Sequence, residues 1–169
     1  MFSSNRQKIF SEIVFGIYIV LLLWLILFKF ATSIDEISHM QNINLIPFGD
    51  STIINGQLAV WEILYNALVF VPFGVYMSLF HPKWSWVQKI LPCLCLSILL
   101  EAMQFAFAIG ASDITDVITN TLGGILGLIL YRLFAALWKK HHIAVINGIG
   151  LAIEITGILL LLLLRIANG

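Results

Sequence analysis

The amino-acid sequence predicts an all-α membrane protein, a bundle of helices that crosses the bilayer several times. Of its 169 residues, 60% are hydrophobic and only 11% are charged, whereas an ordinary soluble domain has about 45–50% apolar and about 25% charged residues. The mean hydropathy of +1.00 leaves too few polar side chains to cover the outside of a folded core. Five apolar segments are each long enough to span the hydrocarbon layer, which takes about 20 helical residues. We therefore expect one membrane domain over residues 1–169.

The five predicted transmembrane helices lie at residues 9–30, 58–80, 87–109, 113–138 and 143–166. The first is longer than the apolar region of a secretory signal, which has about 7–15 residues, so we expect an uncleaved helix. The loop at residues 31–57 mixes amides, aliphatic residues and a proline, a composition that suits the membrane interface or a re-entrant segment. The other connections are short, with loops expected at residues 81–86 and 139–142 and a tight turn at residues 110–112.

The basic residues near the helix ends predict the orientation of the chain, because cytoplasmic loops carry an excess of lysine and arginine. With the N-terminus in the cytoplasm and five spans, the external side receives only Lys29 and Arg165. The cytoplasmic side receives the other seven basic residues, which are Arg6, Lys8, Lys83, Lys89, Arg132, Lys139 and Lys140. We therefore expect a multi-pass protein of the cell membrane with a cytoplasmic N-terminus and an external C-terminus.

The charge balance and the cysteines exclude several classes of function. Nine basic residues balance nine acidic ones, and no basic stripe is present to hold phosphate backbones, so nucleic acid is not expected as a partner. Cys93 and Cys95 lie two apart in an apolar run, which differs from the CxxC spacing of redox and zinc sites. We expect neither a disulfide between these cysteines nor a resident metal or cofactor.

Polar side chains inside the predicted spans indicate where a site lies. An ionisable residue at the bilayer centre costs about 2.5–3.5 kcal/mol on insertion scales, so such groups face the bundle interior, pair, or serve a function. Spacings of three, four and seven residues place each set on one face of its helix. At about 1.5 Å per residue, all of them except Asp113, which begins the fourth span, lie roughly 5–12 Å from the external end. They are Glu62 and Asn66 in the second span, Glu101 and Gln104 in the third, and Asp113, Asp116 and Asn120 in the fourth.

Two interpretations of these converging polar faces are open. Amides and carboxylates hold helices together by hydrogen bonds of about 0.6–2 kcal/mol, and this structural role suits each of the three amides taken singly. The carboxylates of the third and fourth spans together favour a functional pocket, because the sequence places no basic residue within their reach. Lys29 is the nearest by depth, and Arg165 comes next. Without a basic partner, either one of these carboxyl groups is protonated, or a cation or a ligand group enters the pocket.

Two further features of the predicted spans bear on packing. Beyond Asn120, the same side of the fourth span continues with Gly123, Gly124 and Gly127, and the spacing of the first and last lets a neighbouring backbone come close. In the fifth span, Glu154 lies near the bilayer midplane on a face that it shares with an asparagine and two glycines. Whether Glu154 joins the pocket is left open.

Four motifs follow one another along the chain, at residues 42–48, 66–74, 101–104 and 113–127. Together they resemble the VanZ-like family of bacterial membrane proteins, over about residues 42–131. The resemblance implies a small multi-pass protein from a family named after a member that lowers susceptibility to the lipoglycopeptide teicoplanin without remodelling the peptidoglycan terminus. The recurring polar positions of the family fall on the side chains selected above, and they add Asn44 in the first loop.

The candidate ligand-binding residues are therefore Asn44, Glu62, Asn66, Glu101, Gln104, Asp113, Asp116 and Asn120. We expect a non-enzymatic protein whose external pocket binds a lipid, a lipid-linked wall precursor or a lipoglycopeptide, and which lowers teicoplanin susceptibility. The alternative is an intramembrane hydrolase or transferase for a lipid-linked substrate, with Glu101 as general base and Asp113 and Asp116 holding a divalent cation. A transporter is disfavoured because the sequence shows no inverted repeat.

Overall fold

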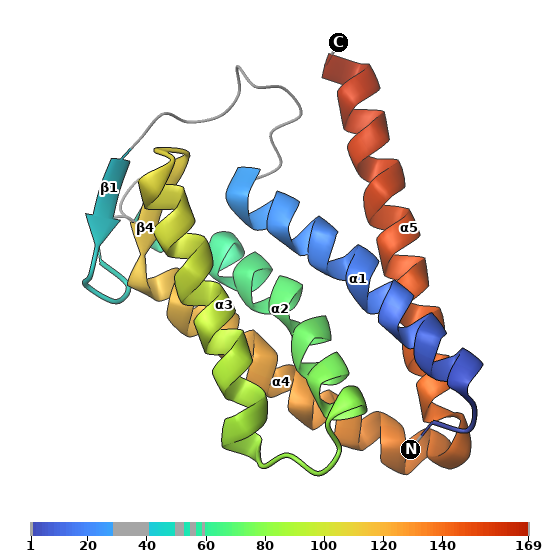
Figure 1. Ribbon diagram of the computed structural model, residues 1–169. Coiled ribbons are helices and arrows are strands. Elements are labelled where there is room, and N and C mark those ends of the chain that lie inside the picture. The colour runs from blue at the N-terminus through green and yellow to red at the C-terminus, as the bar shows by residue number, and fades with distance from the viewer. Residues whose placement is uncertain (1, 29–40, 50–52, 55–56, 59, 169) are drawn as a thin grey trace.

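The computed structural model describes residues 2–28, 41–49, 53–54, 57–58 and 60–168. Long helices dominate it in the order α1 (Asn5–Phe28), α2 (Val60–Phe80), α3 (Trp86–Ala106), α4 (Ile114–Trp138) and α5 (His142–Asn168). Figure 1 shows them running alternately between two ends of the molecule, so that the two chain termini lie at opposite ends. Large apolar side chains cover the outside, and Val20, Leu99 and Leu159 are each more than half exposed. The predicted all-α class is confirmed.

The predicted number of spans is wrong, because four helical segments of the described chain, not five, are long and apolar enough to cross a membrane. Three of them correspond to α1, α2 and α3, and the fourth is a continuous segment of 50 residues, Ile114–Leu163. It contains most of the last two predicted spans, at residues 113–138 and 143–166. The predicted loop at residues 139–142 holds no proline or glycine to end the helix, and the 3-10 helix η3 (Lys139–His141) joins α4 to α5. The chain turns there, as Figure 1 shows, and Lys139 has a φ of 41°.

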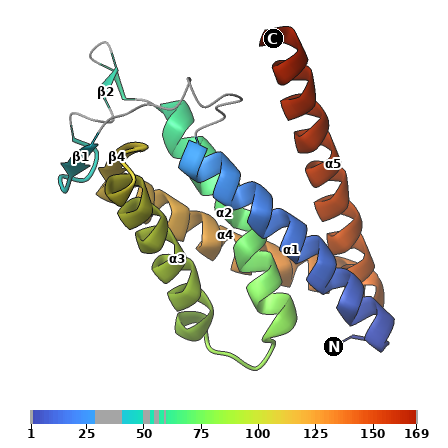
Figure 2. The ribbon, with the colours of Figure 1, turned by 45° about the horizontal axis from the view of Figure 1, so that its top comes forward.

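Short strands, which the sequence analysis does not predict, gather at the end of the molecule opposite the N-terminus (Figure 2). β1 (Gln41–Asn44) pairs in parallel with β4 (Gly110–Asp113), and β2 (Ile53–Ile54) pairs antiparallel with β3 (Gln57–Leu58). The tight turn predicted at residues 110–112 is therefore wrong. Pairing with β1 gives this segment backbone hydrogen bonds that a short turn between two helices leaves unmade.

Local signals explain where α3 begins. Ser85 is its N-cap, and the Ser85 hydroxyl accepts a hydrogen bond from the backbone N–H of Gln88 at 3.3 Å. The Gln88 side chain in turn accepts one from the backbone N–H of Ser85 at 2.8 Å. This reciprocal capping box satisfies two of the backbone donors that a helix start leaves free.

Glycines let α2 and α4 approach backbone to backbone. A Cβ atom at Gly123 would lie 2.0 Å from the carbonyl oxygen of Ala67, and one at Gly127 would lie 2.1 Å from that of Val71. On the α2 side, a Cβ at Gly74 would lie 1.9 Å from the carbonyl oxygen of Gly124. No side chain fits at these contacts. The predicted close approach along the Gly123–Gly127 face is confirmed.

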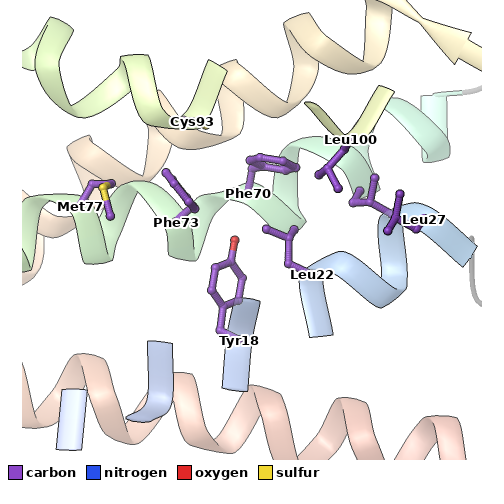
Figure 3. Packing of buried hydrophobic residues seen from close by; sticks show 9 residues of the cluster. Tyr18, Leu22, Leu27, Phe70, Phe73, Met77, Cys93 and Leu100 are labelled. Carbon is purple, nitrogen blue, oxygen red and sulfur yellow. The ribbon is translucent and has the colours of Figure 1, made fainter. Parts of the chain in front are cut away.

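The apolar core lies where α1 meets α2 and α3. Leu22, Phe70 and Leu100, one from each helix, are fully buried there, and Figure 3 shows them with their neighbours. Tyr18 of α1 points its hydroxyl at α2, where it donates a hydrogen bond to the carbonyl oxygen of Val69 at 2.9 Å. This packing holds the first helix against the two helices that carry half of the predicted polar groups.

Candidate functional site

The strand pair fixes the start of α4, and Asp113 is the residue that joins them. As the N-cap of α4, Asp113 accepts a hydrogen bond through Oδ1 from the backbone N–H of Thr115 at 2.8 Å. Its other oxygen, Oδ2, accepts one from the side-chain amide of Asn44 at 3.1 Å. Asn44 uses its own Oδ1 to accept the backbone N–H of Ile46 at 3.1 Å. Asn44 and Asp113 thus hold strand, loop and helix together.

Glu101 ties the end of α3 to the same strand. Its Oε2 accepts a hydrogen bond from the backbone N–H of Asp113 at 2.8 Å, and its backbone carbonyl accepts one from the hydroxyl of Ser112 at 2.5 Å. The Glu101 side chain is 6% exposed. These hydrogen bonds fix the position of Glu101 beside the start of α4.

A cavity of about 190 Å³ lies between the four helices α1 to α4. Side chains from all four helices line it: Leu25, Ile26, Glu62, Tyr65, Asn66, Glu101, Gln104, Asp116 and Asn120. Six of the eight predicted site residues are therefore brought to one place. The other two, Asn44 and Asp113, belong to the strand and cap contacts described above.

Exposure falls from the rim of the cavity to its floor. Glu62 is exposed and Tyr65 is 51% exposed, whereas Gln104 is 1% exposed and Asn120 is fully buried. Asn66 and Asp116 lie between these extremes. A ligand that enters past Glu62 meets progressively drier surroundings, in which each polar contact is stronger.

The amide groups of the cavity use their N–H donors within the protein. Gln104 Nε2 donates to the carbonyl oxygen of Ile26 at 2.9 Å, and Asn66 Nδ2 donates to Asp116 Oδ1 at 2.6 Å. Both partners are acceptors only, so these contacts fix which end of each amide is the nitrogen. Asn120 Nδ2 donates to the hydroxyl oxygen of Ser97 at 2.8 Å. Each of these contacts uses one of the two N–H groups of the amide nitrogen.

Two of these amide oxygens are buried without a hydrogen bond. Gln104 Oε1 and Asn120 Oδ1 have no hydrogen-bond partner among the residues that the structure describes. A buried acceptor left unsatisfied costs about 1–3 kcal/mol. Both residues line the cavity, so its buried end carries two acceptors whose hydrogen-bonding capacity is unused within the described chain.

Acidic side chains from three helices line the cavity. Glu62, Glu101 and Asp116 are its ionisable acidic side chains, and no lysine or arginine lines the cavity in the described part of the chain. Lys29, the nearest basic residue by predicted depth, lies outside the described residues. Arg165 lines a different pocket of about 170 Å³, which is mainly apolar and lies between α1 and α5.

Glu154 does not join the cavity. It is 5% exposed on α5, on the side of the bundle where Asn147 accepts a hydrogen bond from the Tyr76 hydroxyl at 3.2 Å and donates one to Ser11 Oγ at 2.7 Å. The sequence analysis missed Tyr65 and the two α1 residues of the lining. Helical periodicity could have identified Tyr65, because it follows Glu62 by three residues on the same helix face.

Comparison with known proteins shows the family of the chain. The sequence model of the VanZ/LLP1 family matches residues 15–135. The chain is also 39% identical over 161 residues to Protein VanZ of Enterococcus faecium, across 94% of this chain and 92% of the relative. No solved structure matches the chain. The two sequence matches cover all four helices around the cavity, and the chain therefore belongs to the VanZ/LLP1 family.

Proposed function

We propose that this chain lowers the susceptibility of its host to teicoplanin-type lipoglycopeptides. It does so by binding a cell-envelope ligand, or the antibiotic itself, in the cavity that the four helices α1 to α4 surround. Family membership supports the resistance role, since the family is named after a member with that effect. The observation that carries the binding role is the cavity floor, where the oxygens of Gln104 and Asn120 are buried without hydrogen bonds. A protein that used these amides only to hold helices together would have no reason to leave acceptors unsatisfied.

The binding role is tested on the wild-type chain. Expressed in a teicoplanin-susceptible bacterium, it is expected to raise the inhibitory concentration of the drug several-fold over the empty vector. Native mass spectrometry of the purified protein is expected to show a retained lipid or lipid-linked molecule, because unsatisfied buried acceptors favour an occupied cavity. An unchanged inhibitory concentration would overturn the resistance role, and a bare protein mass at every extraction condition would overturn the binding role.

We further propose that the N-terminus is cytoplasmic and that the cavity opens toward the outside. The seven basic residues assigned to the cytoplasmic side lie near the starts of α1 and α3, in the α2–α3 loop, near the end of α4 and in η3. These segments lie at the end of the molecule near the N-terminus (Figure 1). The excess of positive charge at that end favours the cytoplasm.

Orientation is tested by labelling single cysteines in a variant that lacks Cys93 and Cys95. Leu45, which is 74% exposed beside β1, is changed to cysteine in one variant, and Lys140 in another. We expect the cysteine at position 45 to react with an impermeant maleimide in intact cells, and the one at 140 to react only after permeabilisation. The reverse pattern would place the cavity on the cytoplasmic side.

The enzymatic alternative gains no support from the geometry of its proposed cation ligands. Both carboxylate oxygens of Asp113 already accept hydrogen bonds, from Thr115 and Asn44. Asp116 lines the cavity and Asp113 does not. No group of three or more histidine, cysteine, aspartate and glutamate side chains within the described residues is arranged to hold a metal ion. We therefore retain the binding role as the proposal.

A further inference from the structure

We propose that the cavity recognises a primary ammonium group, R–NH₃⁺, carried by a lipid or a lipid-linked molecule. This inference names the ligand class of the site and rests on the proposed binding function. It follows from a feature of two lining amides, Gln104 and Asn120: each nitrogen donates a hydrogen bond inside the protein, whereas each oxygen accepts none among the described residues.

The buried end of the cavity requires a hydrogen-bond donor. Gln104 Oε1 and Asn120 Oδ1 are buried acceptors without hydrogen bonds among the described residues. Gln104 cannot turn its amide to offer nitrogen instead, because its Nε2 donates to the carbonyl oxygen of Ile26. An ammonium group supplies three N–H donors and no acceptor, so it matches a floor made of oxygen.

The wall supplies the opposite charge. The carboxylates of Glu62, Glu101 and Asp116 line the same cavity, and they descend from the exposed rim toward the buried floor. Hydrogen bonds from a charged donor are about twice as strong as neutral ones. A phosphate or a carboxylate would meet the carboxylates of the wall as like charges, which disfavours an anionic head.

The size of the cavity fits a headgroup better than a bare ion. Its volume of about 190 Å³ far exceeds the space of about 10–15 Å³ that one water molecule needs. Leu25 and Ile26 form an apolar wall on the α1 side. The cavity thus suits an ammonium group together with the short carbon chain that bears it.

A methylation series separates donor recognition from attraction by charge. The full-length protein is placed in nanodiscs of phosphatidylglycerol that contain a small fraction of phosphatidylethanolamine, its N-methyl or N,N-dimethyl derivative, or phosphatidylcholine. All four headgroup nitrogens carry the same charge, but their N–H donors fall from three to none. Lipid retained on the protein is counted by native mass spectrometry. We expect retention to fall stepwise, by about tenfold from the first lipid to the last. Equal retention across the series would overturn the proposal.

Two variants assign the effect to the floor. Gln104→Met keeps the length of the side chain and removes Oε1, so most of the preference for the unmethylated headgroup is expected to disappear. Asn147→Leu is the matched control, because it removes a buried amide on α5 that does not line the cavity. It is expected to keep the full preference. A preference that survives in Gln104→Met, or is lost equally in Asn147→Leu, contradicts the assignment.

Competition on the wild-type protein keeps the test independent of variant folding and identifies the source of the ammonium group. Methylammonium is expected to displace retained phosphatidylethanolamine, and tetramethylammonium is not. Equal displacement by both ions overturns donor recognition. Stronger displacement by a lysine-containing, lipid-linked wall precursor than by free ethanolamine phosphate assigns the group to a wall precursor, and the reverse assigns it to a phospholipid head. The resistance measurement is separate, so a flat methylation series with intact teicoplanin protection rejects this inference alone.

Discussion

Gly127→Leu is expected to eliminate folded protein. A Cβ atom at this position would lie 2.1 Å from the carbonyl oxygen of Val71 and 2.9 Å from the Cα of Gly74. These are backbone atoms of α2, so relief requires the two helices to separate. Overpacking a core costs about 1–3 kcal/mol when side chains can shift, and we expect a greater loss here because no side chain can yield. Folded yield after detergent extraction, measured by size-exclusion chromatography, checks the result.

The matched control for this substitution is Gly148→Leu. Gly148 also lies within a helix, α5, but a Cβ atom there meets nothing within 4 Å. Leucine at this lipid-facing position is expected to leave the yield and the melting temperature unchanged. If Gly127→Leu matched the wild type in both measurements, the α2–α4 contact could not be the close backbone contact described above.

Glu101→Gln and Asp116→Asn are each expected to abolish protection against teicoplanin while leaving most of the folded protein intact. Both substitutions keep the shape of the side chain and an oxygen acceptor. Glutamine at 101 can still accept the backbone N–H of Asp113, and asparagine at 116 can still accept the amide of Asn66. What each removes is one negative charge from the cavity wall, where the proposed cationic ligand depends on it.

The inhibitory concentration of the drug is measured beside the melting temperature in detergent for each variant. Glu12→Gln is the control, because Glu12 is an exposed carboxylate whose partner is Lys8 at 3.6 Å on the same helix. An exposed pair of this kind contributes little to stability, so both measurements should match the wild type. Full protection with a lowered melting temperature in the Glu101 and Asp116 variants would show that these carboxylates serve the fold alone.

The polar cavity was predictable because its side chains obey helical spacing. Glu62 and Asn66, or Asp116 and Asn120, must share a face once their segments are helices. Three helices that hide their polar faces from lipid must turn those faces toward one another. The sequence therefore placed six lining residues together without any knowledge of distances.

Other features depend on contacts that no local pattern records. Asp113 has the same spacing to Asp116 as a lining residue would, yet it caps α4 and holds Asn44. Gly110 and its neighbours resemble a turn in sequence, but a segment far away in the chain pairs with them as a strand. The polar junction of α4 and α5 predicts a loop, but polar residues without proline or glycine are also compatible with a helical turn. The structure has such a turn there, η3.

The pairing of Asn44 with Asp113 also constrains the order in which the protein can assemble. This bond joins residues 69 apart, and the chain between them contains the whole of α2 and α3. β4 can pair with β1 only after α3 has crossed the bilayer and returned the chain to the side of the membrane on which β1 lies. The two strands can therefore pair only after the α2–α3 hairpin has been made. Because α4 begins directly after β4 and carries Asp116 and Asn120, a nascent chain stalled before residue 113 lacks two of the residues that line the cavity.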